Sequence, residues 1–316
     1  MSAPLALRAV PILLVCALAA GCGGHAATQQ AAKRPPSHVI LNGGRLVDIG
    51  GGRSLYLKCV GTGGPTVVLE AGFGGNTDNW NGVQPQLGST MRTCSYDRAG
   101  LGNSLPLPGI HDAAAEVKDL QRLLSRAHVP PPYILVGHSY GGMLVRLFAH
   151  AHPDETAGVV LVDAMGRNQD KRAVALWRAA PKRVRDRVPK PSAHPVVDGV
   201  DLGAGEALDA KVKSLGLTPL VVITRGQLIG DPEIAPPLQR PAARLWTRMQ
   251  DELAALSPDS IHVVATRSGH FVQTFGTGQP GVVIRAVRAV ADAANAHRPL
   301  WSCGHVFAGL AARCRG

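Results

Sequence analysis

The stretch Gly137-His138-Ser139-Tyr140-Gly141 constrains the fold more than any other part of this 316-residue chain. It lies between an apolar run, 133–136, and an amphipathic segment, 140–151, so a buried strand, a sharp turn and a helix follow one another. Glycines two positions before and after the serine permit the tight turn, which holds the serine at strained dihedral angles with its hydroxyl exposed. The pattern predicts that Ser139 is a nucleophile. A structural serine in a glycine-rich turn is the alternative.

Further apolar strands alternate with helical segments along the chain. The segments 45–49 and 54–60 flank Gly50-Gly51-Gly52 and predict a hairpin. Other expected strands are 66–70, 93–96, 133–136, 159–162, 220–224 and 261–265, and expected helices are 112–128, 140–151 and 282–296. This alternation predicts a mostly parallel sheet covered by helices on both faces. Residues 164–218 lack a clear strand and contain several prolines, so we interpret them as an inserted cap or lid.

A block of basic residues lies inside this insert. The segment from Arg167 to Lys190 contains nine Lys or Arg and two Asp, a large share of the formal net charge of +11. Such a block can bind nucleic acid or an anionic membrane surface, or it can be the solvated face of an exposed insert. We favour the solvated face and expect no nucleic-acid partner. Apolar residues make up 45% of the chain and charged residues 17%, which indicates a globular protein.

The N-terminal residues are typical of a targeting segment. Arg8 precedes an almost wholly apolar run, 10–20, which is too short to span a bilayer as a stable helix. Ala19-Ala20-Gly21-Cys22 follows and resembles a bacterial lipobox, although alanine stands where leucine is more usual. We therefore expect residues 1–21 to be a signal peptide and Cys22 to carry a lipid. An ordinary secretory signal with an incidental cysteine is the alternative.

The remaining chain divides around the cap. Residues 22–38 are small and polar and predict a flexible tether. The folded core then has a first part, 39–163, and a second part with a C-terminal tail, 219–316, separated by the cap at 164–218. With a lipid at its N-terminus, the protein is expected on the outer face of the bacterial cell membrane, or secreted.

Four cysteines follow the targeting segment: Cys59, Cys94, Cys303 and Cys314. An even number in an exported chain predicts two disulfides, whereas buried free thiols are the alternative. Four cysteines allow three pairings, among which the sequence does not choose. We prefer Cys59–Cys94 together with Cys303–Cys314.

A serine hydroxyl needs a base to accept its proton, and His270 is the candidate. It lies in the loop 267–271, directly after the expected strand 261–265. Such a loop opens at the same sheet edge as the serine turn. A histidine of a surface loop is the alternative. We interpret His138 and His150 as packing residues.

A tetrahedral intermediate on the serine needs backbone N–H donors for its oxyanion. One donor is expected from Tyr140, directly after the serine. The other is expected from Phe73, in the glycine-rich turn after the strand 66–70, where small residues let the backbone approach a substrate closely. A plain tight turn is the alternative for this segment.

Four segments occur in the order typical of one superfamily: Leu69-Glu70-Ala71-Gly72-Phe73-Gly74, Tyr96-Asp97-Arg98-Ala99-Gly100-Leu101-Gly102-Asn103-Ser104, Val136-Gly137-His138-Ser139-Tyr140-Gly141-Gly142 and Ser268-Gly269-His270-Phe271. With them the chain resembles the α/β-hydrolase superfamily over residues 45–296. The resemblance implies the α/β-hydrolase fold, with a mostly parallel central sheet, flanking helices and a cap insert. Ala71-Gly72 departs from the usual His-Gly, which keeps the backbone donor but loses an ordering hydrogen bond. In the family's sheet the strands holding Cys59 and Cys94 are neighbours, which supports that disulfide.

The carboxylate that orients the base has two candidates. Most members of the superfamily carry it a few residues after the strand that corresponds to 220–224, and Asp231 lies slightly beyond that position. Pancreatic lipase and some dehalogenases carry it after the preceding strand, where this chain has Asp163. We favour Asp163 and keep Asp231 as the alternative. We interpret Asp97 and Arg98 as a structural pair that supports the neighbouring loop.

The sequence thus predicts a serine hydrolase that cleaves ester or amide bonds of a small or lipidic substrate through an acyl-enzyme. A non-catalytic binding protein of the same fold is the alternative from another class. A peptidase, a C–C-bond hydrolase or a cofactor-free haloperoxidase would use the same triad. Dehalogenases and epoxide hydrolases use Asp where this chain has Ser139, which argues against them. The chain has no HExxH, paired CxxC or P-loop motif, so we expect no metal or other cofactor.

Overall fold

The computed structural model describes residues 40–41, 43–228 and 234–315. Within these residues the large sheet has ten strands in the order β1–β2–β3–β5–β4–β7–β8–β11–β12–β13. Its strands are β1 (Ile40–Leu41), β2 (Gly44–Gly50), β3 (Arg53–Val60), β4 (Thr66–Glu70), β5 (Thr93–Tyr96), β7 (Tyr133–His138), β8 (Thr156–Val162), β11 (Leu220–Arg225), β12 (Ser260–Ala265) and β13 (Ala312–Arg315). The pairings from β5 through β12 are parallel and those at both margins are antiparallel. The predicted mostly parallel sheet is therefore confirmed.

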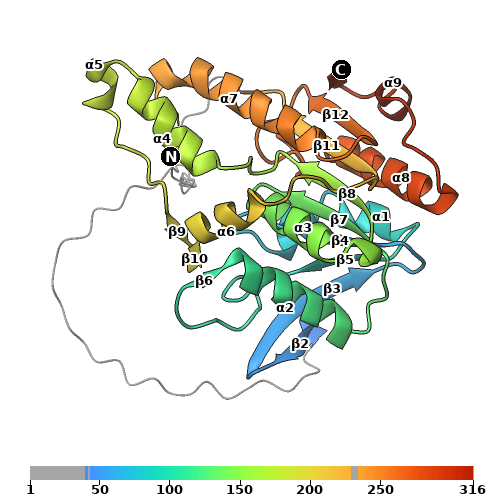
Figure 1. Ribbon diagram of the computed structural model, residues 1–316. Coiled ribbons are helices and arrows are strands. Elements are labelled where there is room, and N and C mark those ends of the chain that lie inside the picture. Colours follow the sequence, from blue (N-terminus) through green and yellow to red (C-terminus); the bar gives the residue numbers. More distant parts are fainter. Residues whose placement is uncertain (1–39, 42, 229–233, 316) are drawn as a thin grey trace, which may run out of the picture.

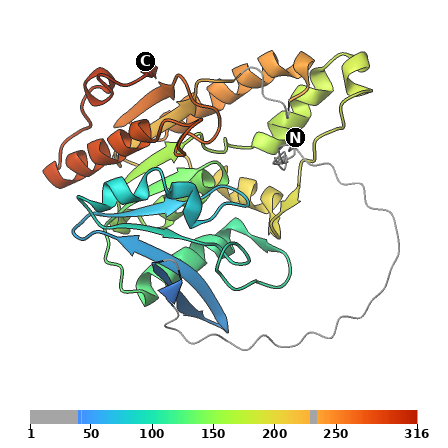
Figure 2. The ribbon, with the colours of Figure 1, turned by 180° about the vertical axis from the view of Figure 1, so that it is seen from behind.

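Helices cover both faces of this sheet (Figure 1). On one face lie α2 (Ala113–Arg126) and α3 (Tyr140–Ala151). On the other lie α8 (Pro280–Ala296) and the short α1 (Gln84–Gly88), which the opposite view brings to the front (Figure 2). The sheet is thus the middle of three layers, and each of its faces has a hydrophobic core of its own.

The buried strand β7 shows why its sequence is apolar throughout. Successive side chains of a strand point to opposite faces. Leu135 therefore belongs to the core under α2 and α3, whereas Ile134 and Val136 belong to the core under α8. All three side chains are fully buried. A strand covered on both sides has no solvent-facing position, so it shows no polar alternation.

The segment between β8 and β11, interpreted from the sequence as a cap, is partly helical. It contains α4 (Gln169–Ala179), α5 (Lys182–Arg185) and α6 (Leu202–Asp209). The remaining helical elements are η1 (Thr77–Trp80), η2 (Pro153–Glu155), α7 (Pro236–Ala254) and α9 (Cys303–Val306). Helix α4 contacts α7, and the two lie together at the top of Figure 1.

The cap also contributes to a small second sheet. Two short cap strands, β9 (Val196–Val197) and β10 (Val200–Asp201), join β6 (His111–Asp112) in the order β6–β10–β9. The sequence predicted no strand in the cap. Two-residue strands are too short to produce a recognisable pattern.

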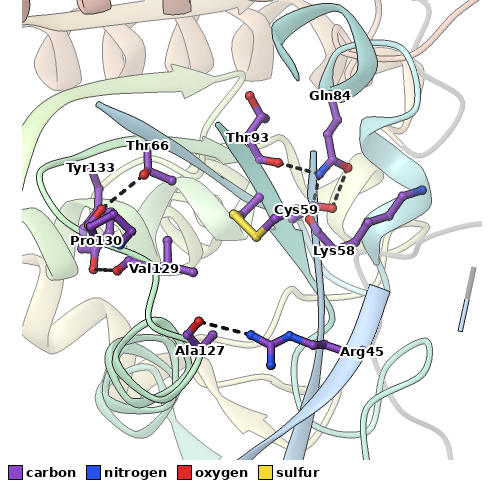
Figure 3. Close-up of a disulfide and its surroundings, with 12 residues drawn as sticks. Arg45, Lys58, Cys59, Thr66, Gln84, Thr93, Ala127, Val129, Pro130 and Tyr133 are labelled. Atoms are coloured by element: carbon purple, nitrogen blue, oxygen red, sulfur yellow. Dashed lines mark hydrogen bonds between the residues drawn. A yellow bond between two sulfur atoms is a disulfide. The ribbon is translucent and has the colours of Figure 1, made fainter. Parts of the chain in front are cut away.

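Two disulfides tie the margins of the large sheet. Cys59 of β3 and Cys94 of β5 lie directly opposite each other and form the first (Figure 3). Cys303 of α9 and Cys314 of β13 form the second. Both preferred pairings are thus present in the structure.

The surroundings of the first disulfide reinforce the same margin (Figure 3). The side-chain amide of Gln84 donates to the carbonyl oxygens of Lys58, 2.8 Å away, and Thr93, 3.1 Å away. Arg45 of β2 donates to the carbonyl oxygen of Ala127, which caps the C-terminal end of α2. A covalent bond, a bridging amide and a guanidinium group therefore hold this margin together.

The expected signal peptide, the lipid-bearing Cys22 and the tether lie outside the described residues. Every helix in the part of the chain that the structure describes is too short or too polar to span a bilayer.

Candidate active site

Ser139 occupies the turn between β7 and α3. Its backbone has φ 53° and ψ −121°, a conformation that residues with a side chain rarely adopt. The Ser139 N–H donates to the carbonyl of Val162 over 3.1 Å, and the Ser139 carbonyl accepts the N–H of Met165 over 2.8 Å. The last residue of β8 and a residue of the following loop thus hold the strained serine from both sides, and the serine lines a cavity at this edge of the sheet.

Close backbone packing explains both glycines of the motif. A Cβ atom on Gly137 would come within 2.5 Å of the carbonyl oxygen of Gly141. A Cβ atom on Gly141 would come within 2.4 Å of the carbonyl oxygen of Glu70, at the end of β4. A larger residue at either position would therefore push the serine turn away from its neighbours.

His270 and Asp163 face each other at the same sheet edge. Asp163 directly follows β8, and His270 lies in the loop after β12. Nδ1 of His270 lies 2.6 Å from Oδ2 of Asp163. The carboxylate is fully buried, whereas the imidazole keeps 28% of its surface exposed and lines the same cavity as Ser139. The structure thus brings these three residues together at one edge of the sheet.

Two further groups, neither of them predicted from the sequence, hold Asp163. Oδ1 of Asp163 accepts the backbone N–H of Arg225 over 3.0 Å and the indole N–H of Trp246 over 2.8 Å. The Arg225 guanidinium lies 4.7 Å from the centre of the Trp246 ring. Burial alone would raise the pKa of Asp163, but the charge of Arg225 and the hydrogen bond with His270 hold this pKa below its ordinary value. The carboxylate is therefore an anion near neutral pH.

Histidines 138 and 150 differ in their surroundings. His138 is buried, with Nε2 3.0 Å from the carbonyl oxygen of His270 and its ring centre 4.6 Å from the His270 ring. Burial, and then the charge of His270, lower the pKa of His138 to about 3, so it remains neutral. His150 is exposed near the end of α3. The interpretation of His150 as a packing residue is therefore wrong.

The expected oxyanion donors, Phe73 and Tyr140, lie against each other. Their rings are stacked with centres 4.0 Å apart. Phe73 lines the cavity, and Tyr140 opens α3, where the first N–H groups of a helix lack partners within the helix. A Cβ atom on Gly72 would lie only 3.0 Å from Cβ of Ser139. The turn that carries Phe73 therefore runs directly beside the serine.

Asp97 and Arg98 both have the expected structural role, but their side chains bind different loops. Asp97 accepts the backbone N–H groups of Thr77 and Asn103, each over 2.8 Å. Arg98 instead donates to the carbonyl oxygen of Gly72 over 2.7 Å. The two charges diverge because neighbouring residues of an extended chain point to opposite sides.

The cavity beside Ser139 and His270 has a volume of about 620 Å³. Helices α4 and α7 and the segment after α5 form much of its wall, with mainly apolar side chains: Leu176, Trp177, Val188, Leu238, Leu245 and Met249. Asp170 is the one acidic residue among the described lining residues. Burial, and then the charge of Glu206, raise the pKa of Asp170 to about 7. The cavity therefore suits an apolar group.

Asp231, the alternative acid, lies outside the described residues. Among the described residues, no group of three or more His, Cys, Asp or Glu side chains is arranged to hold a metal ion.

Comparisons with known proteins agree with this architecture. A family model of the alpha/beta hydrolase fold matches residues 65–194. YqjL, an uncharacterised protein of Bacillus subtilis, is 28% identical over 214 residues, which are 66% of this chain and 78% of YqjL. An AB hydrolase superfamily protein of Gibberella zeae is 36% identical over 110 residues, about a third of each chain.

Solved structures show the same fold. A thermophilic esterase from Thermogutta terrifontis superimposes with a TM-score of 0.54 and 23% identity, over 75% of this chain and 92% of the esterase. At this identity the likeness concerns the fold alone. The matching family model, the order of the strands and the strained serine turn lead to one conclusion: this chain has the α/β-hydrolase fold.

Proposed function

We propose that the protein is a serine hydrolase that cleaves ester bonds of a small or lipidic substrate. One observation carries the proposal: Ser139, at φ 53°, and His270, hydrogen-bonded to Asp163, border the same cavity. A serine hydroxyl is a weak nucleophile and needs an adjacent base, which the imidazole can provide. The buried anion beside the imidazole supports this role because it stabilises the positive charge that proton transfer creates.

In the proposed reaction, Ser139 attacks the ester carbonyl while His270 accepts the hydroxyl proton. His270 then gives this proton to the leaving alcohol, and an acyl-enzyme forms. Water attacks the acyl-enzyme as His270 accepts one of its protons, and the collapse of the second intermediate returns that proton to Ser139. Asp163 orients the imidazole, and the N–H groups of Phe73 and Tyr140 bind the oxyanion.

The cavity wall supports a substrate with an apolar acyl or alcohol part. Side chains such as Leu176 and Leu245 gain by removing hydrocarbon from water, whereas they offer a polar group no partner. Because the Thermogutta terrifontis esterase has the same fold, esters are the first substrates to test. We expect activity on p-nitrophenyl esters to rise with acyl length until the cavity is filled.

The test combines this ester series with a covalent probe. We expect Ser139→Ala to lower kcat by roughly 10⁵- to 10⁶-fold. We also expect a fluorophosphonate to label wild type on the peptide that contains Ser139 and to leave Ser139→Ala unlabelled. Ser192→Ala is the matched control, because Ser192 is an exposed serine of the cap outside the cavity lining. It should retain wild-type turnover and labelling.

Two results would contradict the proposal. One is labelling or ester hydrolysis that survives Ser139→Ala. The other is a folded wild type that binds esters without hydrolysing them, which would favour the non-catalytic binding protein.

We also propose that the protein is exported and anchored to the outer face of the cell membrane through Cys22. The two disulfides support this location, since such bonds persist in oxidising compartments.

A further inference from the structure

The N–H of Tyr140 belongs to a peptide plane whose orientation is fixed. The same plane contains the carbonyl of Ser139, which accepts the N–H groups of Met165 over 2.8 Å and Gly142 over 3.0 Å. In a planar trans peptide the C=O and N–H bonds point in opposite directions. Fixing the carbonyl therefore fixes the direction of the N–H on its far side.

The second proposed donor, Phe73, shares its peptide plane with the carbonyl of Gly72. That carbonyl accepts Nη2 of Arg98 over 2.7 Å, and the preceding carbonyl, of Ala71, accepts Nη1 of Arg98 over 2.6 Å. Alanine has no side chain that could order the turn. The Gly72 carbonyl also accepts the N–H of Gly75 over 3.2 Å. Unlike that single bond, the guanidinium group binds two successive carbonyls, on the side opposite the Phe73 N–H.

Arg98 is itself held in place within the core. It is only 3% exposed, and Nη1 donates to Oε1 of Glu70 over 2.7 Å. Its Nε lies 3.4 Å from Oε1 of Glu116, on α2. Burial alone would lower the pKa of Arg98, but the charges of Glu116 and Glu70 raise it, so the guanidinium remains a cation. A buried cation with these partners has a well-defined position.

The contacts around Arg98 and Glu116 also include Tyr140, the other proposed donor residue. The Tyr140 hydroxyl donates to Oε2 of Glu116 over 2.6 Å, while the opposite oxygen of this carboxylate faces Arg98. The guanidinium lies 5.3 Å from the centre of the Tyr140 ring, and that ring stacks on Phe73. One buried cation is therefore in contact with both halves of the proposed oxyanion hole.

We propose that Arg98 is a positioning residue for the oxyanion hole: it orients the Gly72–Phe73 peptide and, together with Glu116, the side chain of Tyr140. The inference rests on the proposed function, in which Ser139 is the nucleophile. Lysine cannot replace arginine here, because a single ammonium does not grip two carbonyls as a planar fork does.

The direct readout is the backbone amide signal of Phe73. The chain has only five Phe, so selective ¹⁵N-phenylalanine labelling gives a simple spectrum, which Phe73→Leu assigns. In Arg98→Lys we expect the Phe73 amide to shift or broaden and to exchange faster with water. The amide of Phe307, which packs in the core under α8, should stay in place.

Kinetics give the consequence for turnover. In Arg98→Lys we expect kcat to fall by roughly ten- to a hundredfold, because a small misplacement of a group at the reacting centre has an effect of this size. The KM for a p-nitrophenyl ester should change by less than about twofold. Affinity for a trifluoromethyl ketone, which places an oxyanion in the hole, should fall by the same factor as kcat/KM. Affinity for the product carboxylic acid should be unchanged.

A matched control and a milder variant complete the design. Arg53→Lys alters another arginine that forms an ion pair with α2, through Asp119, away from the oxyanion turn. We expect it to leave both the Phe73 amide and kcat unchanged. Should Arg98→Lys fail to fold, Tyr140→Phe removes only the hydroxyl that binds Glu116. It should move the same amide and lower kcat several-fold.

The outcomes separate the two proposals. A folded Arg98→Lys variant with wild-type kcat overturns the positioning role, whether or not the Phe73 amide moves. An unmoved amide with lowered kcat overturns it as well. An amide that moves, in a protein whose ester hydrolysis survives Ser139→Ala, shows instead that the proposed function is wrong.

Discussion

The indole N–H of Trp246 donates to Oδ1 of Asp163 over 2.8 Å, while Nδ1 of His270 lies 2.6 Å from the other oxygen of the same carboxylate. Trp246 belongs to α7, which also forms part of the cavity wall. One hydrogen bond therefore joins the wall of the proposed substrate cavity to the proposed acid.

Trp246→Phe tests this connection. The substitution keeps an aromatic ring but removes the donor, so the buried Asp163 loses one of its hydrogen bonds. We expect kcat/KM to fall by about five- to tenfold, the effect of one such bond. Trp301→Phe is the control, because Trp301 is an exposed tryptophan outside the cavity lining. Equal kcat/KM in the two variants would contradict the role of Trp246.

The identity of the acid is tested by paired substitutions. Asparagine at position 163 no longer stabilises the imidazolium and favours the wrong tautomer of His270, so we expect kcat of Asp163→Asn to fall by about 10⁴-fold. Asp231→Asn should retain turnover close to that of wild type. Steady-state hydrolysis of one ester by both variants decides between them. The reverse result would assign the acid to Asp231.

The raised pKa of Asp170 leads us to expect that the free energy of unfolding depends on pH. Burial, and then the charge of Glu206, raise the pKa of Asp170 from 3.8 to about 7. Between these pH values the native protein binds a proton that the unfolded chain releases. The free energy of unfolding of wild type therefore falls as the pH rises from about 4 to about 7 and stays lower above that. Asp170→Asn should be more stable than wild type by about 1–2 kcal/mol near pH 8, and nearly equal to it near pH 4.

Urea unfolding of wild type and Asp170→Asn at a series of pH values measures this difference. Asp186→Asn serves as the control, since Asp186 is an exposed cap aspartate whose partner, Lys182, is exposed as well. Its stability should follow that of wild type at every pH. A variant Asp170→Asn that is less stable than wild type near pH 8 would show that the carboxylate is needed for a contact.

Lipid attachment is tested in a bacterial host that processes lipoproteins. Cells supplied with an alkyne-labelled fatty acid should incorporate it into wild type but not into Cys22→Ser. Wild type should remain with the membrane fraction after a wash at high salt, which removes electrostatically bound protein. Label on Cys22→Ser, or none on wild type, would favour an ordinary secretory signal.

The centre of the fold could be predicted from the sequence because its determinants are local. Three local patterns were enough to predict their own secondary structure: the apolar run of β7, the glycines of the motif and the amphipathic pattern of α3. Helix α7 was missed because Pro236 and Pro241 interrupt the helical pattern. Pro236 lies in the first turn, where proline is tolerated because its missing N–H has no partner in any case. Pro241 lies inside the helix, and the packing of α7 against the sheet overrides its unfavourable effect.

The contacts around the candidate site were less predictable because they join distant parts of the chain. Trp246 lies 83 residues from Asp163 in the sequence, and no local pattern connects them. The ion pair between Arg98 and Glu70 is weakly indicated by the sequence, because a carboxylate at the end of an apolar buried strand needs a partner. The sequence does not say which of the many basic residues provides it.

The positions of the two disulfides have a consequence for how the site persists. The bridges join cysteines that lie 35 and 11 positions apart in the sequence, and neither closed loop includes residues 95–302, which contain Ser139, Asp163 and His270. A cross-link reduces the freedom of the unfolded chain only within the loop that it closes. The disulfides therefore do not reduce the conformational entropy of the unfolded chain in the stretch that carries the reactive groups. Burial and hydrogen bonding alone must stabilise its folded state.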